Sequence, residues 1–304
     1  MLNKQKLNIA IIAVALSVVC CAGGNAQTNG RKTECDYAPV TLPEIPENIT
    51  FAGEKVPMNE FYVKEAMQRE LITNEYMHTR MLTTLLNTNR YFSVIEPILK
   101  KYGIPEDFKY LCVAESNLNP DAVSSAGAAG LWQFMASTAK EYGLLVNSCI
   151  DERYDPEKAT DAACRYLLNA HGKLGNWTLV AASYNVGING VLRRLNQQFT
   201  DSYYDTVMPI ETSRYVFRIL AYKVMMADPE AYGYCVREKD KYPPLDKYRK
   251  IKVGEKNIDW VKVARDNGIT YKLLKLYNPW IRTLTYENKD GREFEVKIPV
   301  AKTK

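Results

Sequence analysis

Apolar residues recur at three- and four-residue intervals through most of the chain between residues 59 and 226, which is the period of an amphipathic helix. The pattern predicts helices over Asn59–Thr88, Tyr91–Tyr102, Pro156–Gly172, Trp177–Val186 and Thr212–Met226. No alternation of apolar and polar residues of comparable strength precedes residue 245. This part of the chain is therefore predicted to be mainly α.

The pattern changes after Tyr242-Pro243-Pro244, a run that ends regular structure. Beyond it the sequence predicts a strand, two short helices and a second strand: Tyr248–Val253, Ile258–Asn267, Tyr271–Leu276 and Phe294–Pro299. This order predicts a small α+β (βααβ) module over residues 245–304, following a helical domain over residues 51–240. Residues 27–50 carry three prolines and little periodic pattern, which favours an extended linker.

The first 26 residues have the pattern of a secretory signal peptide. Lys4 and Lys6 precede the apolar run Leu7–Cys21, and Gly24 and Ala26 supply small residues at the −3 and −1 positions of a cleavage site. The run is shorter than the roughly 20 residues that span a bilayer, which argues against a transmembrane anchor. We expect export to the periplasm or cell envelope.

A second interpretation of the leader makes Cys20 or Cys21 a lipid-modified N-terminus, which would attach the protein to the outer membrane. Lipoprotein processing requires a small residue before the cysteine, and Val19 precedes Cys20. Lipid attachment is therefore the second choice. The sequence makes no prediction of oligomeric state.

Cleavage after Ala26 leaves five cysteines, an odd number for an oxidising compartment. Buried free thiols, or one or two bridges, are expected. The cysteine spacings match no zinc pattern, and the chain contains only two histidines, so we predict no metal and no cofactor.

Charge differs between the two parts. Residues 27–240 contain 22 Lys and Arg against 27 Asp and Glu, a net charge of −5, whereas residues 241–304 contain 16 against 8, a net charge of +8. A basic module on an acidic domain favours contact with an anionic polymer, and a solvated positive face is the alternative. Export and the acidic domain argue against nucleic acid as the partner.

One carboxylate falls on a predicted buried helix face. A helix that begins at Pro105 and ends before Asn119 carries Glu115 in its last turn. Glu115 shares one face of this helix with three apolar residues, Phe108, Leu111 and Cys112. Burial and the negative end of the helix dipole both predict a raised pKa, which suits a general acid. The alternative is a glutamate that reaches solvent or pairs with a basic residue.

The segment after this helix consists of small residues, SSAGAAG at positions 124–130, followed directly by LWQF. Small side chains let backbone groups approach a ligand closely, which favours a binding loop beside Glu115. A tight connection between two helices is the alternative.

Four short motifs occur in order along the chain: Glu115-Ser116, GLWQ at 130–133, ASYNVG at 182–187, and Glu211-Thr212 leading to Tyr215-Val216. Together they resemble the lysozyme-like lytic transglycosylases, in particular the D-type membrane-bound enzymes that act on peptidoglycan. The similarity runs from about Phe51 to about Ala227. It implies a lysozyme-like helical catalytic domain.

The resemblance also implies roles for individual residues. Glu115 would be the sole catalytic acid and base, Ser116 would support it or the sugar, and four residues would bind substrate: Gln133, Tyr184 and Asn185 at the sugar subsites and Tyr215 near the acid. Each of these four also has a structural alternative, as a core tyrosine, a helix end or a backbone partner. Trp132 stands where many members carry methionine, a difference that bears on the shape of the subsites.

The reaction implied is cleavage of the β-1,4 bond between N-acetylmuramic acid and N-acetylglucosamine, with a 1,6-anhydromuramyl product and no water consumed. Ordinary glycosidases need two carboxyl groups. Three other acids have structural explanations: Asp121 in a loop, Asp155 as a helix N-cap and Asp161 inside a helix. The alternatives are a hydrolytic muramidase of the same fold and a non-catalytic peptidoglycan-binding protein.

The C-terminal module resembles LysM, a small fold that binds N-acetylglucosamine polymers, over residues 260–279 in particular. The match is partial, because Gly254-Glu255-Lys256-Asn257 stands where a Gly-Asp-Thr turn is usual. Binding of glycan strands and simple packing on the catalytic domain are both consistent with this pattern.

Overall fold

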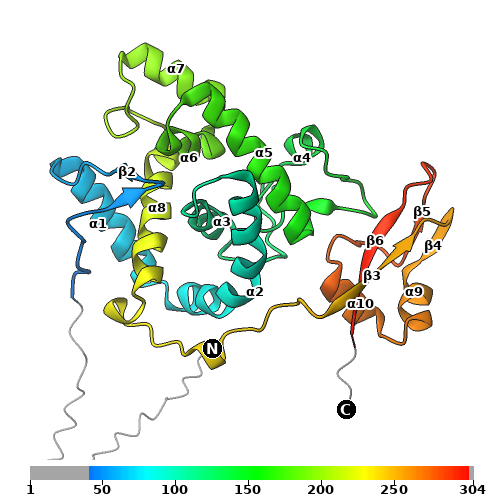
Figure 1. Cartoon of the computed structure of the whole chain (residues 1–304). Coiled ribbons are helices and arrows are strands. Elements are labelled where there is room, and N and C mark those ends of the chain that lie inside the picture. The colour runs from blue at the N-terminus through cyan, green and yellow to red at the C-terminus, as the bar shows by residue number, and fades with distance from the viewer. Residues whose placement is uncertain (1–40, 301–304) are drawn as a thin grey trace, which may run out of the picture. The chain divides into compact units, whose positions relative to one another are not determined.

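The computed structural model describes residues 41–300 (Figure 1). The predicted signal peptide, most of the predicted linker, and Cys20, Cys21 and Cys35 lie outside the described residues. None of the helices within residues 41–300 combines the length and apolar character needed to cross a bilayer.

Helices dominate the chain as far as residue 227. They are α1 (Phe61–Glu75), α2 (His78–Tyr102), α3 (Phe108–Ser116), α4 (Ala136–Glu141), α5 (Pro156–Leu174), α6 (Trp177–Val186), α7 (Ile188–Gln198) and α8 (Ile210–Ala227). The predicted helices ending at Gly172 and Met226 are confirmed within two residues at each end, and the bounds of α6 match. Short α4 and amphipathic α7 were not predicted.

The predicted break between the first two helices was wrong. The sequence placed it at residues 89–90, whereas α1 ends at Glu75 and α2 runs without interruption from His78 through Pro97. At the predicted break the chain stays helical, and the buried Thr88 hydroxyl donates to the Leu85 carbonyl within the helix at 2.7 Å. The true break, at Met77, carries no glycine or proline to announce it.

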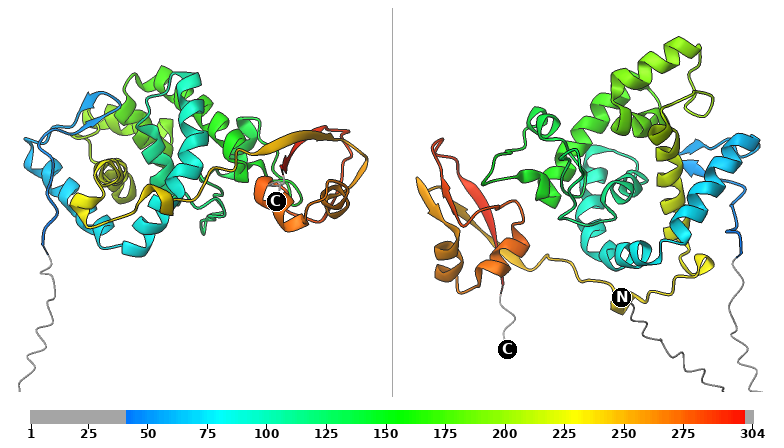
Figure 2. Two further views of the ribbon diagram at one scale, coloured as in Figure 1. Left: turned by 60° about the horizontal axis from the view of Figure 1, so that its bottom comes forward. Right: turned by 180° about the vertical axis from the view of Figure 1, so that it is seen from behind.

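Helix α3 lies at the centre of this part, with α2, α5, α6 and α8 around it (Figures 1 and 2). Its apolar face is fully buried at Phe108, Leu111 and Cys112, as the helical spacing predicts. The helix begins three residues later than Pro105, because the first backbone bonds there are tight i to i+3 turns.

A two-residue hairpin, β1 (Thr50–Phe51) with β2 (Glu54–Lys55), precedes α1 and was not predicted. Its Glu54 carboxylate accepts the backbone N–H groups of Trp177 and Thr178 at the start of α6, at 2.6 and 2.9 Å. A carboxylate at that end of a helix is favoured by the helix dipole. The hairpin therefore packs with the helical part, and of its residues only Thr50 falls within the predicted linker.

The C-terminal residues form the predicted strands and helices, with two additions. Strands β3 (Tyr248–Val253) and β6 (Phe294–Pro299) have the predicted bounds and pair antiparallel. Between them lie β4 (Asn257–Asp259), α9 (Trp260–Asp266), α10 (Tyr271–Tyr277) and β5 (Thr285–Glu287), with β4 and β5 paired. The core contains Trp260, Trp280 and Phe294, all almost fully buried. The expected mainly α fold with a small α+β module is confirmed.

Candidate active site

Glu115 occupies the last turn of α3, one residue before the helix ends at Ser116. The next two residues, Asn117 and Leu118, both have positive φ (53° and 55°), so the chain reverses sharply after the glutamate. Asn117 is held by the hydroxyl of Tyr222 in α8, which donates to its side-chain oxygen at 2.5 Å. Glu115 is half-buried, while its apolar neighbours on the same face are inaccessible.

Burial raises the pKa of Glu115 to about 7. The Tyr215 hydroxyl donates to Glu115 Oε1, and this bond and the nearby Arg218 lower the pKa, while the charge of Glu211 raises it. Burial has the largest effect. A carboxyl that is partly protonated near neutral pH and exposed to solvent on one side can act as a general acid.

Three residues of α8 act on Glu115 because they share one face of that helix. Glu211, Tyr215 and Arg218 are four and three positions apart, and Arg218 Nη1 donates to Glu211 Oε1 at 3.0 Å. Sequence reasoning singled out Tyr215 but gave no role to Arg218 or Glu211. The helical spacing from Tyr215 was the signal that could have found them.

Gln133 lies on an irregular segment between α3 and α4 with a backbone φ of 47°. Its side-chain amide donates to the Ala122 carbonyl at 3.0 Å and to the Gly130 carbonyl at 2.8 Å. The backbone pairing that sequence reasoning held as an alternative for Gln133 is therefore present. The segment is closed on itself by further bridges, from Ala129 to Val123 and to Phe134.

Gly130 cannot carry a side chain, and the reason is not the approach to a ligand that the sequence led us to expect. Its φ is 78°, and a Cβ added there would lie 2.0 Å from the Arg153 carbonyl oxygen. The close approach at Gly130 is therefore to the chain itself and not to a ligand. The neighbouring Ser125, Ala126 and Gly127 are exposed.

Tyr184 is half-buried near the end of α6, and its hydroxyl donates to the Trp132 carbonyl at 2.9 Å. Its ring packs between those of Trp132, Phe134 and Tyr166. Burial raises the pKa of Tyr184 well above its ordinary value, and the Glu115 charge adds to this, so Tyr184 is close to the acid. Trp132 itself is fully buried, a core residue.

Asn185 is exposed, and its side-chain oxygen accepts a hydrogen bond from Thr212 Oγ1 at 2.6 Å. This bond occupies the amide oxygen, and the NH₂ group is the donor end of the same side chain. Thr212 lay in a motif that the sequence singled out, but its role came only from the contact between α6 and α8.

Ser116 is the predicted site residue that does not join the others. Its side chain is buried, and its hydroxyl donates to the Cys112 carbonyl one turn earlier in α3 at 3.2 Å. The structure thus brings Glu115 into contact with Tyr215. It also brings Tyr184 into contact with the segment that carries Gln133, through the Trp132 carbonyl.

The other acids take the structural roles expected of them. Asp155 caps α5, accepting the backbone N–H groups of Glu157 and Lys158. Asp161 lies inside α5, where it binds Tyr102 and Arg165. Asp121 is exposed in the loop after α3.

No group of three or more His, Cys, Asp or Glu side chains within residues 41–300 is arranged to hold a metal ion. Four cysteines lie in that range, and each is a free thiol: Cys112, Cys149, Cys164 and Cys235. A cavity of about 850 Å³ is lined by parts of α2, α5 and the segment around Leu245. Glu115 is not among its lining residues, so this cavity is separate from the site.

Two families of known domains match the chain. Residues 93–207 match the transglycosylase SLT domain, and residues 249–302 match the C-terminal LysM-like domain of soluble lytic transglycosylases. The chain carries both domains, in the order that the motifs suggested. The first match contains Glu115, Gln133, Tyr184 and Asn185, and it ends before Tyr215.

Among relatives, membrane-bound lytic murein transglycosylase D of Escherichia coli is 28% identical over 238 residues. The alignment covers 76% of this chain and 50% of the relative, so the chain spans about half the length of that protein. Among solved structures, an inactive mutant of the lytic transglycosylase Slt from Pseudomonas aeruginosa is 24% identical, covering 50% of this chain and 26% of that one, with a TM-score of 0.39. The soluble lytic transglycosylase of E. coli is 23% identical, covering 49% and 26%, with a TM-score of 0.35.

Proposed function

We propose that this chain, which carries a transglycosylase SLT domain and a LysM-like domain, cleaves peptidoglycan glycan strands between N-acetylmuramic acid and N-acetylglucosamine and forms a 1,6-anhydromuramyl end. The observation that carries the proposal is Glu115, a half-buried carboxyl whose pKa is raised to about 7 and which Tyr215 holds by a hydrogen bond. The match to the SLT domain supplies the substrate class.

In the proposed reaction Glu115 begins protonated and donates its proton to the oxygen that bridges the two sugars. The bond from that oxygen to muramyl C1 breaks, and the N-acetylglucosamine end leaves as an alcohol. Glu115, now a carboxylate, takes the proton of the muramyl C6 hydroxyl while that oxygen bonds to C1. Glu115 ends protonated as it began, and no water enters the balance.

Five polar residues would serve this reaction. Tyr215 orients the Glu115 carboxyl and stabilises it when it is ionised. The NH₂ group of Asn185, with its oxygen held by Thr212, would donate to the sugar or its N-acetyl group. Tyr184 and Gln133 would shape the subsites through the segment that they tie together. Ser116 would act within α3, because its hydroxyl is already used there.

The C-terminal module would bind glycan, and its excess of Lys and Arg favours an anionic wall and a salt-dependent interaction. We further propose export to the periplasm or cell envelope through the predicted signal peptide, with lipid attachment at Cys20 or Cys21 as the alternative that would place the protein on the outer membrane.

A hydrolytic muramidase is the second candidate, and one observation bears on it. Glu211 is a carboxylate whose charge reaches Glu115, and it is exposed on the same face of α8. It could position a water, although Arg218 pairs with it at 3.0 Å. The residue to test as a second acid is therefore Glu211.

The deciding experiment is mass spectrometry of soluble products from purified peptidoglycan incubated with residues 27–304, with Glu115→Gln and with Glu211→Gln. Exposed Glu47→Gln is the matched control. Products lighter by one water than hydrolysis products, lost in Glu115→Gln and kept in the other two, support the proposal. Reducing muramyl ends that disappear in Glu211→Gln would favour the muramidase. No product from any protein, with unchanged wall binding, would favour a binding protein.

A further inference from the structure

The C-terminal module contacts two neighbouring parts of the helical domain. At the start of α5, Lys297 of the module pairs with Glu157 at 2.7 Å. The backbone contacts lie in the turn between α4 and α5. The backbone N–H of Asp151 donates to the Trp280 carbonyl at 2.9 Å, and the N–H of Arg282 donates to the Cys149 carbonyl at 2.8 Å. Between these bonds Ile150 pairs with Ile281 as an isolated antiparallel bridge. The two parts therefore share backbone hydrogen bonds and not only side-chain contacts.

Ile150 belongs to the hydrophobic core of the module. It is fully buried, and its apolar neighbours are those of the module, with Trp260, Trp280 and Phe294, not those around α3. Next to it the Arg282 guanidinium lies 3.9 Å from the centre of the Tyr154 ring, a cation–π contact. Ile150, an isoleucine of the helical part, thus forms part of the hydrophobic core of the C-terminal module.

The turn that carries Ile150 is internally braced. Asn147 Oδ1 accepts the backbone N–H groups of Cys149 at 2.9 Å and Ile150 at 2.8 Å. The Glu152 carboxylate accepts the N–H of Leu145 at 2.7 Å. A turn fixed at both ends transmits a displacement from the module to the residues that follow it.

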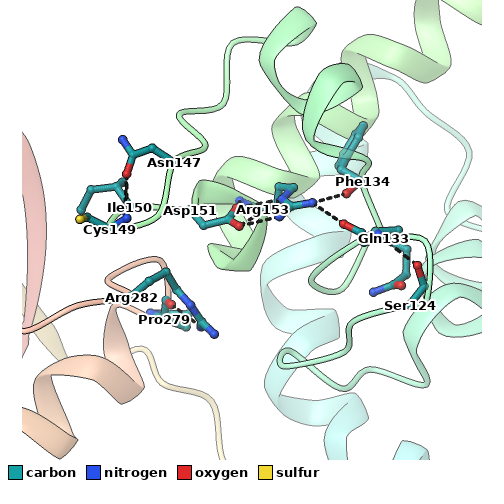
Figure 3. A network of polar contacts seen from close by, with 12 residues as sticks. Ser124, Gln133, Phe134, Asn147, Cys149, Ile150, Asp151, Arg153, Pro279 and Arg282 are labelled. Carbon is teal, nitrogen blue, oxygen red and sulfur yellow. Dashed lines mark hydrogen bonds and ion pairs between the residues drawn. The ribbon is translucent and has the colours of Figure 1, made fainter.

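The next residue in that path is Arg153, which is 9% exposed and forms a two-pronged ion pair with Asp151. Nε and Nη2 of Arg153 lie 2.9 and 2.7 Å from the two Asp151 carboxylate oxygens. The same Asp151 gives its backbone N–H to the module. Asp151 therefore joins the docking contact to a buried guanidinium (Figure 3).

Arg153 reaches across to the segment that carries Gln133. Its Nη1 donates to the Gly127 carbonyl at 2.8 Å and to the Phe134 carbonyl at 3.0 Å, and its own carbonyl blocks any side chain at Gly130. Figure 3 shows the guanidinium lying between Asp151 and this segment. Arg153 thus binds the segment at Gly127 and Phe134 and lies against it at Gly130, with Gln133 between the two last points.

We propose that the docked C-terminal module is a positioning element for the Gln133 segment, acting through Asp151 and Arg153, in addition to any contact that it makes with glycan. The inference rests on the proposed function for its catalytic consequence. Arg153 is a positioning residue, because it contacts the segment and not the reacting atoms. Undocking the module would free Gln133 and, through the Trp132 carbonyl, Tyr184.

Two variants of residues 27–304 disrupt different contacts in the series that links the module to the Gln133 segment. Ile150→Asp places a charge where the isoleucine enters the module's core, so it undocks the module. Arg153→Lys keeps the charge but removes the fork that binds two carbonyls, so it frees the segment while the module stays docked. Ile150→Val keeps the docking, and Leu168→Asp puts an acid at an exposed position of α5 as the matched control.

Amide hydrogen exchange tests the coupling without any activity. Ile150→Asp should speed exchange at least tenfold at Arg282, which reports undocking, and also at Ala129, Gly130 and Gln133. Arg153→Lys should do so at those three alone, and neither should change α1 or α8. If Ala129, Gly130 and Gln133 keep the exchange of the unmodified chain while Arg282 is freed, the inference is overturned.

Kinetics on a soluble tetrasaccharide of two disaccharide repeats gives the catalytic readout. Both variants should lose about tenfold in kcat with KM changed less than threefold, and the double variant should lose no more than either alone because the two lie on one path. Ile150→Val and Leu168→Asp should stay within twofold. Additive losses would overturn the shared path. An inactive unmodified chain would count against the proposed function, and the exchange data would still decide the coupling.

Discussion

Glu115 and Gln133 lie in one candidate site but are held in place by different means. Glu115 stands at the end of a regular helix, and its partner Tyr215 stands on another, so helical spacing and packing place both. Gln133 stands on a segment without regular structure, held by Arg153 from a turn some twenty residues later. The comparison teaches that the position of Glu115 depends on the helical core, whereas that of Gln133 depends on a few specific long-range bonds.

The largest expected effect comes from a substitution that separates the Gln133 segment from Arg153. Gly130→Ala places a Cβ 2.0 Å from the Arg153 carbonyl oxygen, at a φ of 78°, so we expect a loss of about 4 kcal/mol in the free energy of unfolding or no folded protein. Gly127→Ala is the matched control, with a φ of 86° and open space around its Cβ, and should lose about 1 kcal/mol. Urea denaturation measures both. Equal losses would show that backbone strain alone matters.

A second prediction concerns the free-energy cost of ionising the half-buried Glu115. Its pKa is raised to about 7 in the folded protein, so the native state binds more protons than the unfolded state between pH 4.5 and 7. Stability should fall as pH rises through that range, by at most about 3 kcal/mol. Glu115→Gln removes this term, so its stability relative to the unmodified chain should rise between pH 4.5 and 8 in urea denaturation. Glu47→Gln should show no such trend, and a parallel pair of curves would contradict the raised pKa.

A third prediction separates the acid from its partner. The Tyr215 hydrogen bond lowers the pKa of Glu115, so Tyr215→Phe should raise it further and move the alkaline limb of the pH–rate profile upward. We expect about a tenfold loss of activity at neutral pH from the lost orientation. The control is Tyr222→Phe, on the same helix as Tyr215. It removes a hydroxyl that donates to the Asn117 side chain, and it should leave the alkaline limb in place. A shift in both variants would assign the effect to α8 as a whole.

The smallest expected effect is at Asn185. Thr212→Val removes the hydroxyl that fixes the Asn185 amide, so activity should fall a few-fold, about 1 kcal/mol in the barrier, with little change in stability. Thr83→Val is the control, because the Thr83 hydroxyl bonds only to carbonyls of α2. Initial rates on soluble glycan and a melting curve check both variants. A loss as large as that of Tyr215→Phe would contradict the minor sugar-binding role proposed for Asn185.

Most helices, and the first and last strands of the module, were predictable because each follows from a local sequence pattern. The apolar face of α3, the cap at Asp155 and the bounds of β3 and β6 follow from spacing over a few residues. The break at Met77 was not, since no residue there disfavours a helix and only packing decides where α1 gives way to α2. The hairpin β1–β2 was missed for a similar reason, because two-residue strands leave no periodic pattern.

By itself the sequence determined which residue types stand at which spacing: an acid at the end of an apolar helix face, small residues after it, and a basic module behind an acidic domain. The tertiary structure alone decided which of them meet. Arg218 and Glu211 act on Glu115, Thr212 fixes Asn185, and Arg153 braces the segment of Gln133 while Ser116 turns inward. The physical reason is that helix formation depends on neighbours within one or two turns, whereas burial, charge and hydrogen-bond partners depend on chain segments brought together from far apart.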